Sequence, residues 1–199
     1  MPSPARGRVS GMTEVLATER LTLRPWKVGD ADETRVLFSL ASNPHIGPRA
    51  GWPAHRSVED SAAIIRGVLS TDETYAVVLS ATGEPVGSIG LKPLSGIIAP
   101  SAEENRGALE IGYWIGEPYW GRGLVPEAAR ELMRYGFEDL GLEAIWGTHD
   151  VNNKQSSRVM DKLGLRIVRT RDHVYFPLID EYHDEAIRRI TRAQWEHER

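Results

Sequence analysis

Residues 109–129, which read LEIGYWIGEPYWGRGLVPEAA, are the most informative segment of the chain. Residues 109–115 predict a β-strand, and Gly121 and Gly123 then predict a turn that leads straight into a helix. Glycine lets the backbone approach a ligand closely, and a helix start offers unpaired N–H groups and the positive end of its dipole. The segment therefore predicts a site for an anion such as a diphosphate.

The same two glycines can also be no more than a tight turn, and neither common nucleotide motif decides between these alternatives. The Gly-Lys-Ser/Thr ending of the phosphate-binding loop is missing, and a dinucleotide motif needs glycine where Pro126 stands.

Around this segment the chain alternates between strand and helix patterns. Helices are expected after Asp30, from Ser57, over 126–140, where apolar residues recur at three and four, and over 154–163. Further strands are expected at 21–26, 75–80, 86–91, 144–148, 165–170 and 183–190. This order predicts an α/β fold with one mixed sheet of about seven strands, flanked by about four helices. We expect a flexible N-terminal tail over 1–17, followed by a single domain over 18–199.

Composition limits the function classes. The 199 residues are 41% hydrophobic and 26% charged, which is typical of a globular domain large enough to need no metal or disulfide for stability. There is no cysteine, so disulfides, thiolate zinc sites and cysteine nucleophiles are excluded. The net charge of −4 provides no overall basic field for nucleic acid. With no membrane-length apolar run and no signal-peptide pattern, we expect a cytoplasmic protein.

A second block, at 153–164, reads NKQSSRVMDKLG. Together with Glu110–Ile115 and the Tyr119–Gly123 turn, it resembles the GCN5-related N-acetyltransferases (GNAT), in the branch that includes the ribosomal-protein N-terminal acetyltransferases. The resemblance implies a sheet splayed after its fourth strand and acetyl-CoA as the co-substrate. It also implies cofactor-binding roles, by main-chain groups at the strand and turn, for Tyr113, Trp114, Ile115, Gly121, Arg122, Gly123, Leu124, Val125 and Asn153.

Two residues depart from the family pattern. Val125 replaces a smaller residue beside the expected phosphates, although main-chain contacts should preserve binding. Met160 stands where many members carry a tyrosine that protonates the departing thiolate. Ser156 is the best remaining candidate for that donor, with another side chain or water as the alternatives, unless its hydroxyl bonds only to its own helix backbone.

Glu110 is the leading candidate for the general base, because a carboxylate inside an apolar strand can have a raised pKa. The alternative is that it pairs with an arginine such as Arg24 or Arg106. His149 is a weaker candidate base. The six histidines show no i,i+3 or i,i+4 pair, so we expect no helical metal site.

These patterns favour an N-acetyltransferase that transfers acetyl directly to a primary amine, since no cysteine exists to hold an acetyl intermediate. The branch resemblance favours a protein or peptide N-terminus. A small amine, an amino acid or an antibiotic remains an alternative acceptor, and a weakly catalytic CoA-binding module is the alternative from another class. The long segment 93–107 is expected to be a surface loop, with a lid, substrate edge or subunit contact as alternatives, and a homodimer is plausible by analogy.

Overall fold

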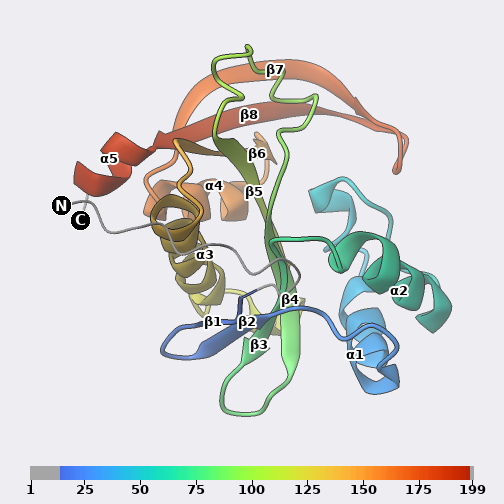
Figure 1. Ribbon diagram of the computed structural model, residues 1–199. Helices are drawn as coiled ribbons and strands as arrows, with labels where there is room; N and C mark the ends of the chain where they lie inside the picture. The colour runs from blue at the N-terminus through green and yellow to red at the C-terminus, as the bar shows by residue number, and fades with distance from the viewer. Residues whose placement is uncertain (1–13, 198–199) are drawn as a thin grey trace.

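The computed structural model describes residues 14–197 and contains one mixed β-sheet (Figure 1). The strand order is β1-β2-β3-β4-β5-β6-β8-β7, and every neighbouring pair is antiparallel except β5 and β6, which are parallel. The predicted α/β class is therefore confirmed, with eight strands instead of about seven. The strands are β1 Leu16–Ala17, β2 Leu21–Arg24, β3 Thr74–Leu79, β4 Pro85–Lys92, β5 Ala108–Ile115, β6 Ala144–Asp150, β7 Arg166–Phe176 and β8 Glu181–Thr191.

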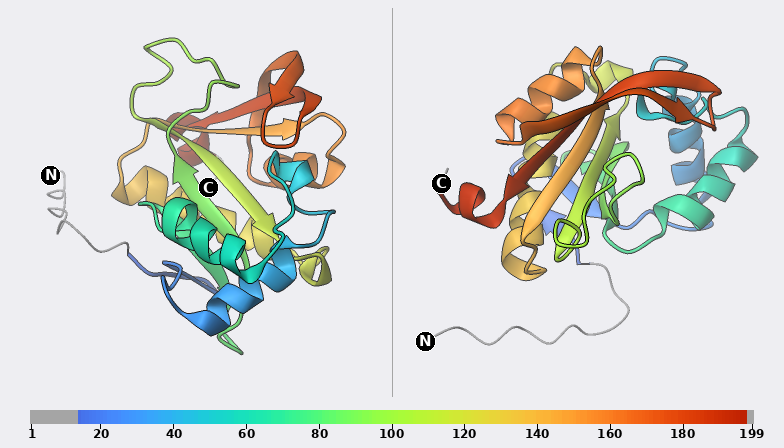
Figure 2. Two further views of the ribbon diagram at one scale, coloured as in Figure 1. Left: turned by 90° about the vertical axis from the view of Figure 1, so that its right-hand side faces the viewer. Right: turned by 90° about the horizontal axis from the view of Figure 1, so that it is seen from above.

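Helices cover both faces of the sheet (Figure 2). Helices α1 (Ala31–Ala41) and α2 (Val58–Ile64) lie on one face, and α3 (Leu124–Arg134) and α4 (Lys154–Lys162) lie on the other. The last helix, α5 (Arg192–His197), follows β8 and was not predicted from the sequence. We refer below to the two sides of the sheet as the α1/α2 face and the α3/α4 face.

Local side-chain caps explain where the first two helices begin. The Asp30 carboxylate accepts hydrogen bonds from the N–H groups of Asp32 and Glu33, and the Ser57 hydroxyl accepts from Asp60 N–H. Both starts agree with the sequence. Helix α3 is shorter than the predicted 126–140, because it ends at Arg134 and continues as a π-helical turn over Tyr135–Asp139.

The apolar core is divided by the sheet. On the α3/α4 face, residues such as Ile111, Leu132 and Ile145 form the largest cluster. On the α1/α2 face, Trp26 packs with Leu37 and Ile65. The segment 93–107 adds a third cluster, because its Ile98 is completely buried against β6 and β8. This loop is thus anchored to the sheet and does not merely cover its surface.

The N-terminal boundary differs from the expected one. Leu16 is only 3% exposed and pairs with Leu23 of β2, so residues 16–17 belong to the sheet and not to a flexible tail. Residues 1–13 of the expected tail lie outside the described residues. Over residues 14–197, none of the helices has the length and apolar character needed to span a membrane.

Candidate active site

Strand β5 separates from β6 halfway along its length. The two strands pair only at residues Ala108, Leu109 and Glu110, opposite Ala144, Ile145 and Trp146. Beyond this point β6 continues beside β8 as far as Asp150, while no strand in the described chain pairs with the same edge of β5. The end of β5 therefore carries main-chain groups that the sheet does not use.

The register shows which of these groups face the split. Gly116 N–H donates to Val86 O, and in an antiparallel pair the residues alternate between facing the partner strand and facing away. Ile115 and Tyr113 consequently direct their main-chain N–H and C=O groups toward the open edge, whereas those of Trp114 face β4. The Trp120 indole N–H donates to Ile115 O at 2.9 Å, which leaves the Ile115 N–H for a ligand.

Gly121 and Gly123 both adopt positive φ angles, +74° and +75°, where residues with a side chain are strained. A methyl group placed on Gly121 would meet nothing within 4 Å among the described atoms. Gly123 is the N-cap of α3, and no side chain in the described structure caps that helix. The first N–H groups of α3, from Leu124 and Val125, thus remain available for an anion. The Val125 side chain itself packs against the core cluster.

An ion pair that no sequence motif indicated supports this turn. Arg20 lies 2.6 Å from the Glu127 carboxylate in the first turn of α3 and also donates to Arg122 O at 3.1 Å. Thr18 donates a further hydrogen bond to Glu127. Burial alone would raise the pKa of Glu127, but the bonds from Thr18 and Arg20 lower it. Glu127 thus stays ionised, with Arg20 compensating its charge beside the anion site.

Two hydroxyl groups meet at the start of α4. The Tyr113 hydroxyl is 2.9 Å from Ser156 Oγ, and the Asn153 side chain caps the helix by accepting from Ser156 N–H. Burial raises the pKa of Tyr113 to about 12, so this phenol stays protonated at neutral pH. Met160 is completely buried in the α3/α4 core. The sequence identified Ser156 and the main chain of Tyr113 but missed the Tyr113 hydroxyl.

Glu110 lies at the point where the two strands part and is 3% exposed. Its carboxylate accepts from Ser95 N–H at 3.0 Å and from the Thr148 hydroxyl at 3.3 Å. Lys92 Nζ lies 3.6 Å away. Of the two arginines considered as partners from the sequence, Arg24 instead pairs with Glu33 at 2.7 Å, and the ion pair found for Glu110 is with Lys92 and not with Arg106.

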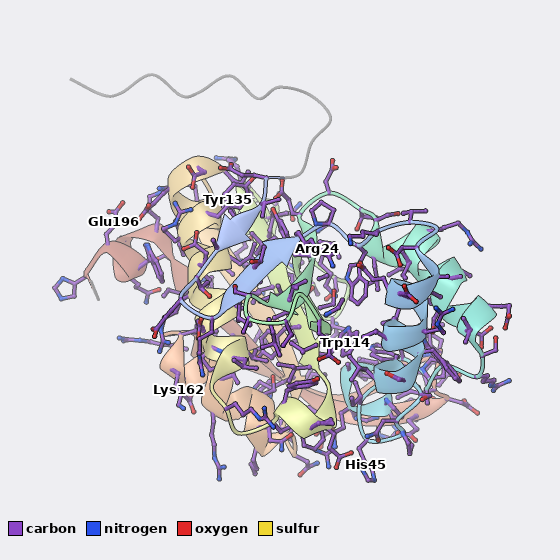
Figure 3. All side chains as sticks on the ribbon, turned by 90° about the horizontal axis from the view of Figure 1, so that it is seen from below. Arg24, His45, Trp114, Tyr135, Lys162 and Glu196 are labelled. Carbon is purple, nitrogen blue, oxygen red and sulfur yellow. The ribbon has the colours of Figure 1, made fainter. Side chains whose placement is uncertain are left out.

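Aromatic side chains border the same region on the α1/α2 face. Trp114 and Trp52 are in edge-to-face contact with ring centroids 5.8 Å apart, and His55 lies 5.4 Å from Trp52. Figure 3 shows Trp114 between the sheet and the first helices. Trp26 is buried and donates to Ser88 Oγ, as expected of a packing residue.

His149 lies on the opposite face, in a buried network. Its Nε2 accepts from Arg188 Nε at 3.0 Å, and its Nδ1–H donates to Asp150 O. Burial lowers the pKa of His149, which favours the neutral ring. Arg188 also binds Asp161 and Ser157 of α4. This arrangement fits a histidine that fixes α4 against the sheet better than one that meets a substrate amine.

Comparisons with known proteins agree with this geometry. Residues 20–166 match the family model for the acetyltransferase (GNAT) domain. N-acetyltransferase p20 of Bacillus licheniformis, itself uncharacterized, is 28% identical, with 88% of this chain and 97% of that protein aligned. The uncharacterized protein YkkB of Bacillus subtilis is 36% identical over 78% of this chain and 87% of its own. YdaF of Bacillus subtilis, which carries a provisional name as a ribosomal N-acetyltransferase, is 34% identical over 45% and 49%.

Solved structures show the same fold at lower identity. A GNAT acetyltransferase from Bacillus anthracis superposes with a TM-score of 0.76 at 22% identity, covering 90% of this chain and 99% of that one. The microcin C7 self-immunity acetyltransferase MccE, solved with acetyl-CoA and AMP, has a TM-score of 0.68 at 17% identity, covering 87% and 93%.

Proposed function

Because the chain belongs to the GNAT acetyltransferase family, we propose that it transfers the acetyl group of acetyl-CoA directly to the N-terminal amine of a protein or peptide. The observation that carries this proposal is the split between β5 and β6 beside the uncapped start of α3. An extended ligand with an anionic end can pair with the open edge of β5 while its anion meets the helix N-terminus. Acetyl-CoA has this form, with a diphosphate at one end and an amide-containing arm that ends in the thioester.

The residues divide between the two ends of the co-substrate. Gly121, Arg122, Gly123, Leu124 and Val125 would bind the diphosphate through their main-chain N–H groups. Tyr113 would pair with the arm through its main-chain groups at the open edge, the Ile115 N–H would meet the thioester at the end of the arm, and the amide nitrogen of Asn153 would donate to the arm. Since the main-chain groups of Trp114 face β4, we assign that residue's side chain to the acceptor side instead. MccE shares this fold and was solved with acetyl-CoA, which supports acetyl-CoA as the co-substrate.

The reaction needs a neutral amine, donors for the oxyanion that develops on the thioester, and a proton for the leaving thiolate. We propose that Glu110 meets the acceptor ammonium and that Ile115 N–H stabilises the oxyanion. The Ser156 and Tyr113 hydroxyls would supply the proton to the thiolate, whose conjugate acid has a pKa of about 8.5. No cysteine is present, so the transfer would be direct, within a complex of both substrates.

Two considerations support a protein or peptide acceptor. One is the branch of the family that the sequence resembles, and the other is the likeness to YdaF, whose name refers to the ribosome. The acceptor would enter from the α1/α2 face, where Trp52 and Trp114 are in contact and where the Glu110 side chain also lies.

The test is thiol release from acetyl-CoA with a panel of acceptors. The panel should hold peptides with free N-termini, the same peptides with blocked N-termini and a lysine, and small amines. We expect turnover only with free N-termini, with mass spectrometry locating one acetyl group on the first residue. Faster turnover of small amines would contradict the peptide acceptor but keep the acetyltransferase. Binding of CoA without turnover of any acceptor would favour the non-catalytic module.

A further inference from the structure

Glu185 of β8 is a buried carboxylate without a partner. It is 4% exposed, yet no hydrogen bond or ion pair to its carboxylate is found among residues 14–197. Neither of its oxygens is completely sealed from solvent. Because burying an unpaired charge is costly, a side chain of this kind needs an explanation.

The two residues opposite Glu185 are both engaged elsewhere. Asp150, its neighbour on β6, accepts a hydrogen bond from His183 at 2.8 Å. Arg171, its neighbour on β7, is the obvious cationic partner but donates instead to the carbonyls of Gly96 and Ile97. The sheet therefore leaves Glu185 free to meet a cation from outside the chain.

Glu185 and Glu110 lie on the same face of the sheet. Alternation places Glu185 beside Ile187 on β8 and beside Asp150 and Thr148 on β6, and Thr148 hydrogen-bonds to Glu110. The next residue along β5 on this face is Gly112. A methyl group placed on Gly112 would meet only the Lys92 side chain, at 3.9 Å, so space remains beside Glu110. The two carboxylates thus face the same side of the sheet, Glu110 on β5 and Glu185 on the half of the sheet across the split.

The other charged groups on this face around Glu185 come from strands β4 to β8 and from the 93–107 loop. They are Lys92 on β4, Glu110 on β5, Asp150 on β6, Arg169 and Arg171 on β7, His183 and Arg189 on β8, and Glu104, which pairs with Arg169. The nearest of them do not neutralise Glu185. Burial raises the pKa of Glu185 to about 7, with Asp150 and Glu110 raising it further and His183 opposing them.

We propose that Glu185 is the group that takes the proton from the acceptor ammonium, while Glu110 holds that ammonium in place. This inference rests on the proposed acetyl transfer and refines its base, which the sequence placed at Glu110. The Glu110 carboxylate already accepts from Ser95 N–H and the Thr148 hydroxyl and lies 3.6 Å from Lys92 Nζ, so it is held in place, whereas the Glu185 carboxylate has no such bonds from the described residues. A base works best when its pKa lies near the working pH, as that of Glu185 does.

The ammonium gives one proton to the Glu185 carboxylate, and the neutral amine attacks the thioester carbon. The C–N bond forms and the C–S bond breaks, and the sulfur carries away the electron pair of that bond. The second proton of the nitrogen reaches the thiolate through the Ser156 and Tyr113 hydroxyls, and Glu185 later releases its proton to solvent.

The experiment compares kcat/KM from pH 5.5 to 9 for the wild type, Glu185→Gln, Glu110→Gln and the control Asp172→Asn, an exposed acid on β7. Two acceptor peptides whose N-terminal amines differ in pKa separate the inflection of the enzyme from that of the substrate. We expect the wild type to lose activity below about pH 7 with both peptides. Glu185→Gln should lower kcat/KM by about 10²-fold or more at pH 8 and remove this inflection.

Glu110→Gln should raise KM and keep the inflection, and Asp172→Asn should behave as the wild type. Calorimetric binding of CoA must be unchanged in all three variants, which shows that the co-substrate site is intact. If Glu185→Gln keeps both the rate and the inflection, or if Glu110→Gln is the variant that loses the inflection, the assignment of the base is wrong. A wild type that turns over no acceptor contradicts the proposed function itself, which is a different result.

Discussion

The Tyr113 hydroxyl on β5 lies 2.9 Å from Ser156 Oγ on α4, so the two sides of the split sheet meet at a pair of proton donors. Burial keeps Tyr113 protonated by raising its pKa to about 12. Met160 is buried and its side chain has no proton to donate to the thiolate. The Tyr113 and Ser156 hydroxyls can donate one instead.

We expect Tyr113→Phe and Ser156→Ala each to lower kcat by about 10-fold, and the double variant to lose little more than the worse single variant. Two hydroxyls that act as one relay should show this non-additivity. Steady-state kinetics at saturating acetyl-CoA provide the measurement, and an unchanged CoA dissociation constant is the control. Full activity in the double variant would exclude the pair as the proton source.

Substitutions of Gly123 test whether the start of α3 binds the diphosphate. Gly123→Glu should abolish CoA binding, because it places a carboxylate and a strained φ of +75° at the uncapped start of α3. Gly123→Ala should weaken binding less, through backbone strain alone. Calorimetric titration with CoA and with pantetheine separates charge repulsion from backbone strain, since pantetheine lacks the diphosphate. Wild-type affinity in Gly123→Glu would place the diphosphate elsewhere.

Arg20 should affect the affinity for CoA by compensating the charge of Glu127. Arg20→Gln leaves an uncompensated carboxylate in the first turn of α3, so the dissociation constant of CoA should rise by about 10-fold, more at low salt. In the double variant Arg20→Gln with Glu127→Gln the charge is gone and affinity should return. A double variant as weak as Arg20→Gln would mean that Arg20 itself contacts the ligand.

The raised pKa of Glu185 has a consequence for stability. In the unfolded chain this group titrates near 4.5, and in the folded protein near 7, so the folded state binds more protons between these values. The free energy of unfolding should therefore fall as the pH rises from 4.5 to about 7, by up to about 3 kcal/mol from this group, at 1.36 kcal/mol per pKa unit.

Glu185→Gln should remove this dependence and stabilise the protein above pH 7. Urea denaturation at pH 4.5 and pH 8 measures it, with Asp172→Asn as the control. If Glu185 has a functional role, Glu185→Gln should make the protein more stable and less active. If its role is structural, the same substitution should make the protein less stable. If Glu185→Gln is less stable than the wild type at pH 8, the Glu185 carboxylate is not an unpaired buried charge.

Much of the fold could be predicted because local signals were strong. Asp30 and Ser57 cap their helices as the sequence indicated, and the glycines before α3 predicted its start. The elements that were missed lacked such signals. Strand β1 has only two residues, too few for an apolar alternation to show. Strand β7 is exposed on most of its length, so no apolar alternation reveals its end.

The site was predictable only where a linear motif marks it. Glu110 and Ser156 lie in or beside such motifs. Glu185 does not, because a glutamate among the charged residues of β8 looks like a solvated position. Only the folded chain shows that Arg171 turns away from it and that Asp150 is already paired. Likewise, the burial of Ile98 shows that segment 93–107 is held to the sheet, which its length and lack of strand or helix periodicity did not indicate.

The short parallel seam of β5 and β6 has a mechanical consequence. Three residue pairs join the half of the sheet that precedes α3 to the half that follows it. A bound arm in the gap would continue that ladder, so the ligand would act as a substitute strand that couples both halves. Hydrogen exchange at the amides of Tyr113 and Ile115 would then slow together with that of β6, and loading with co-substrate would complete the cooperative unit.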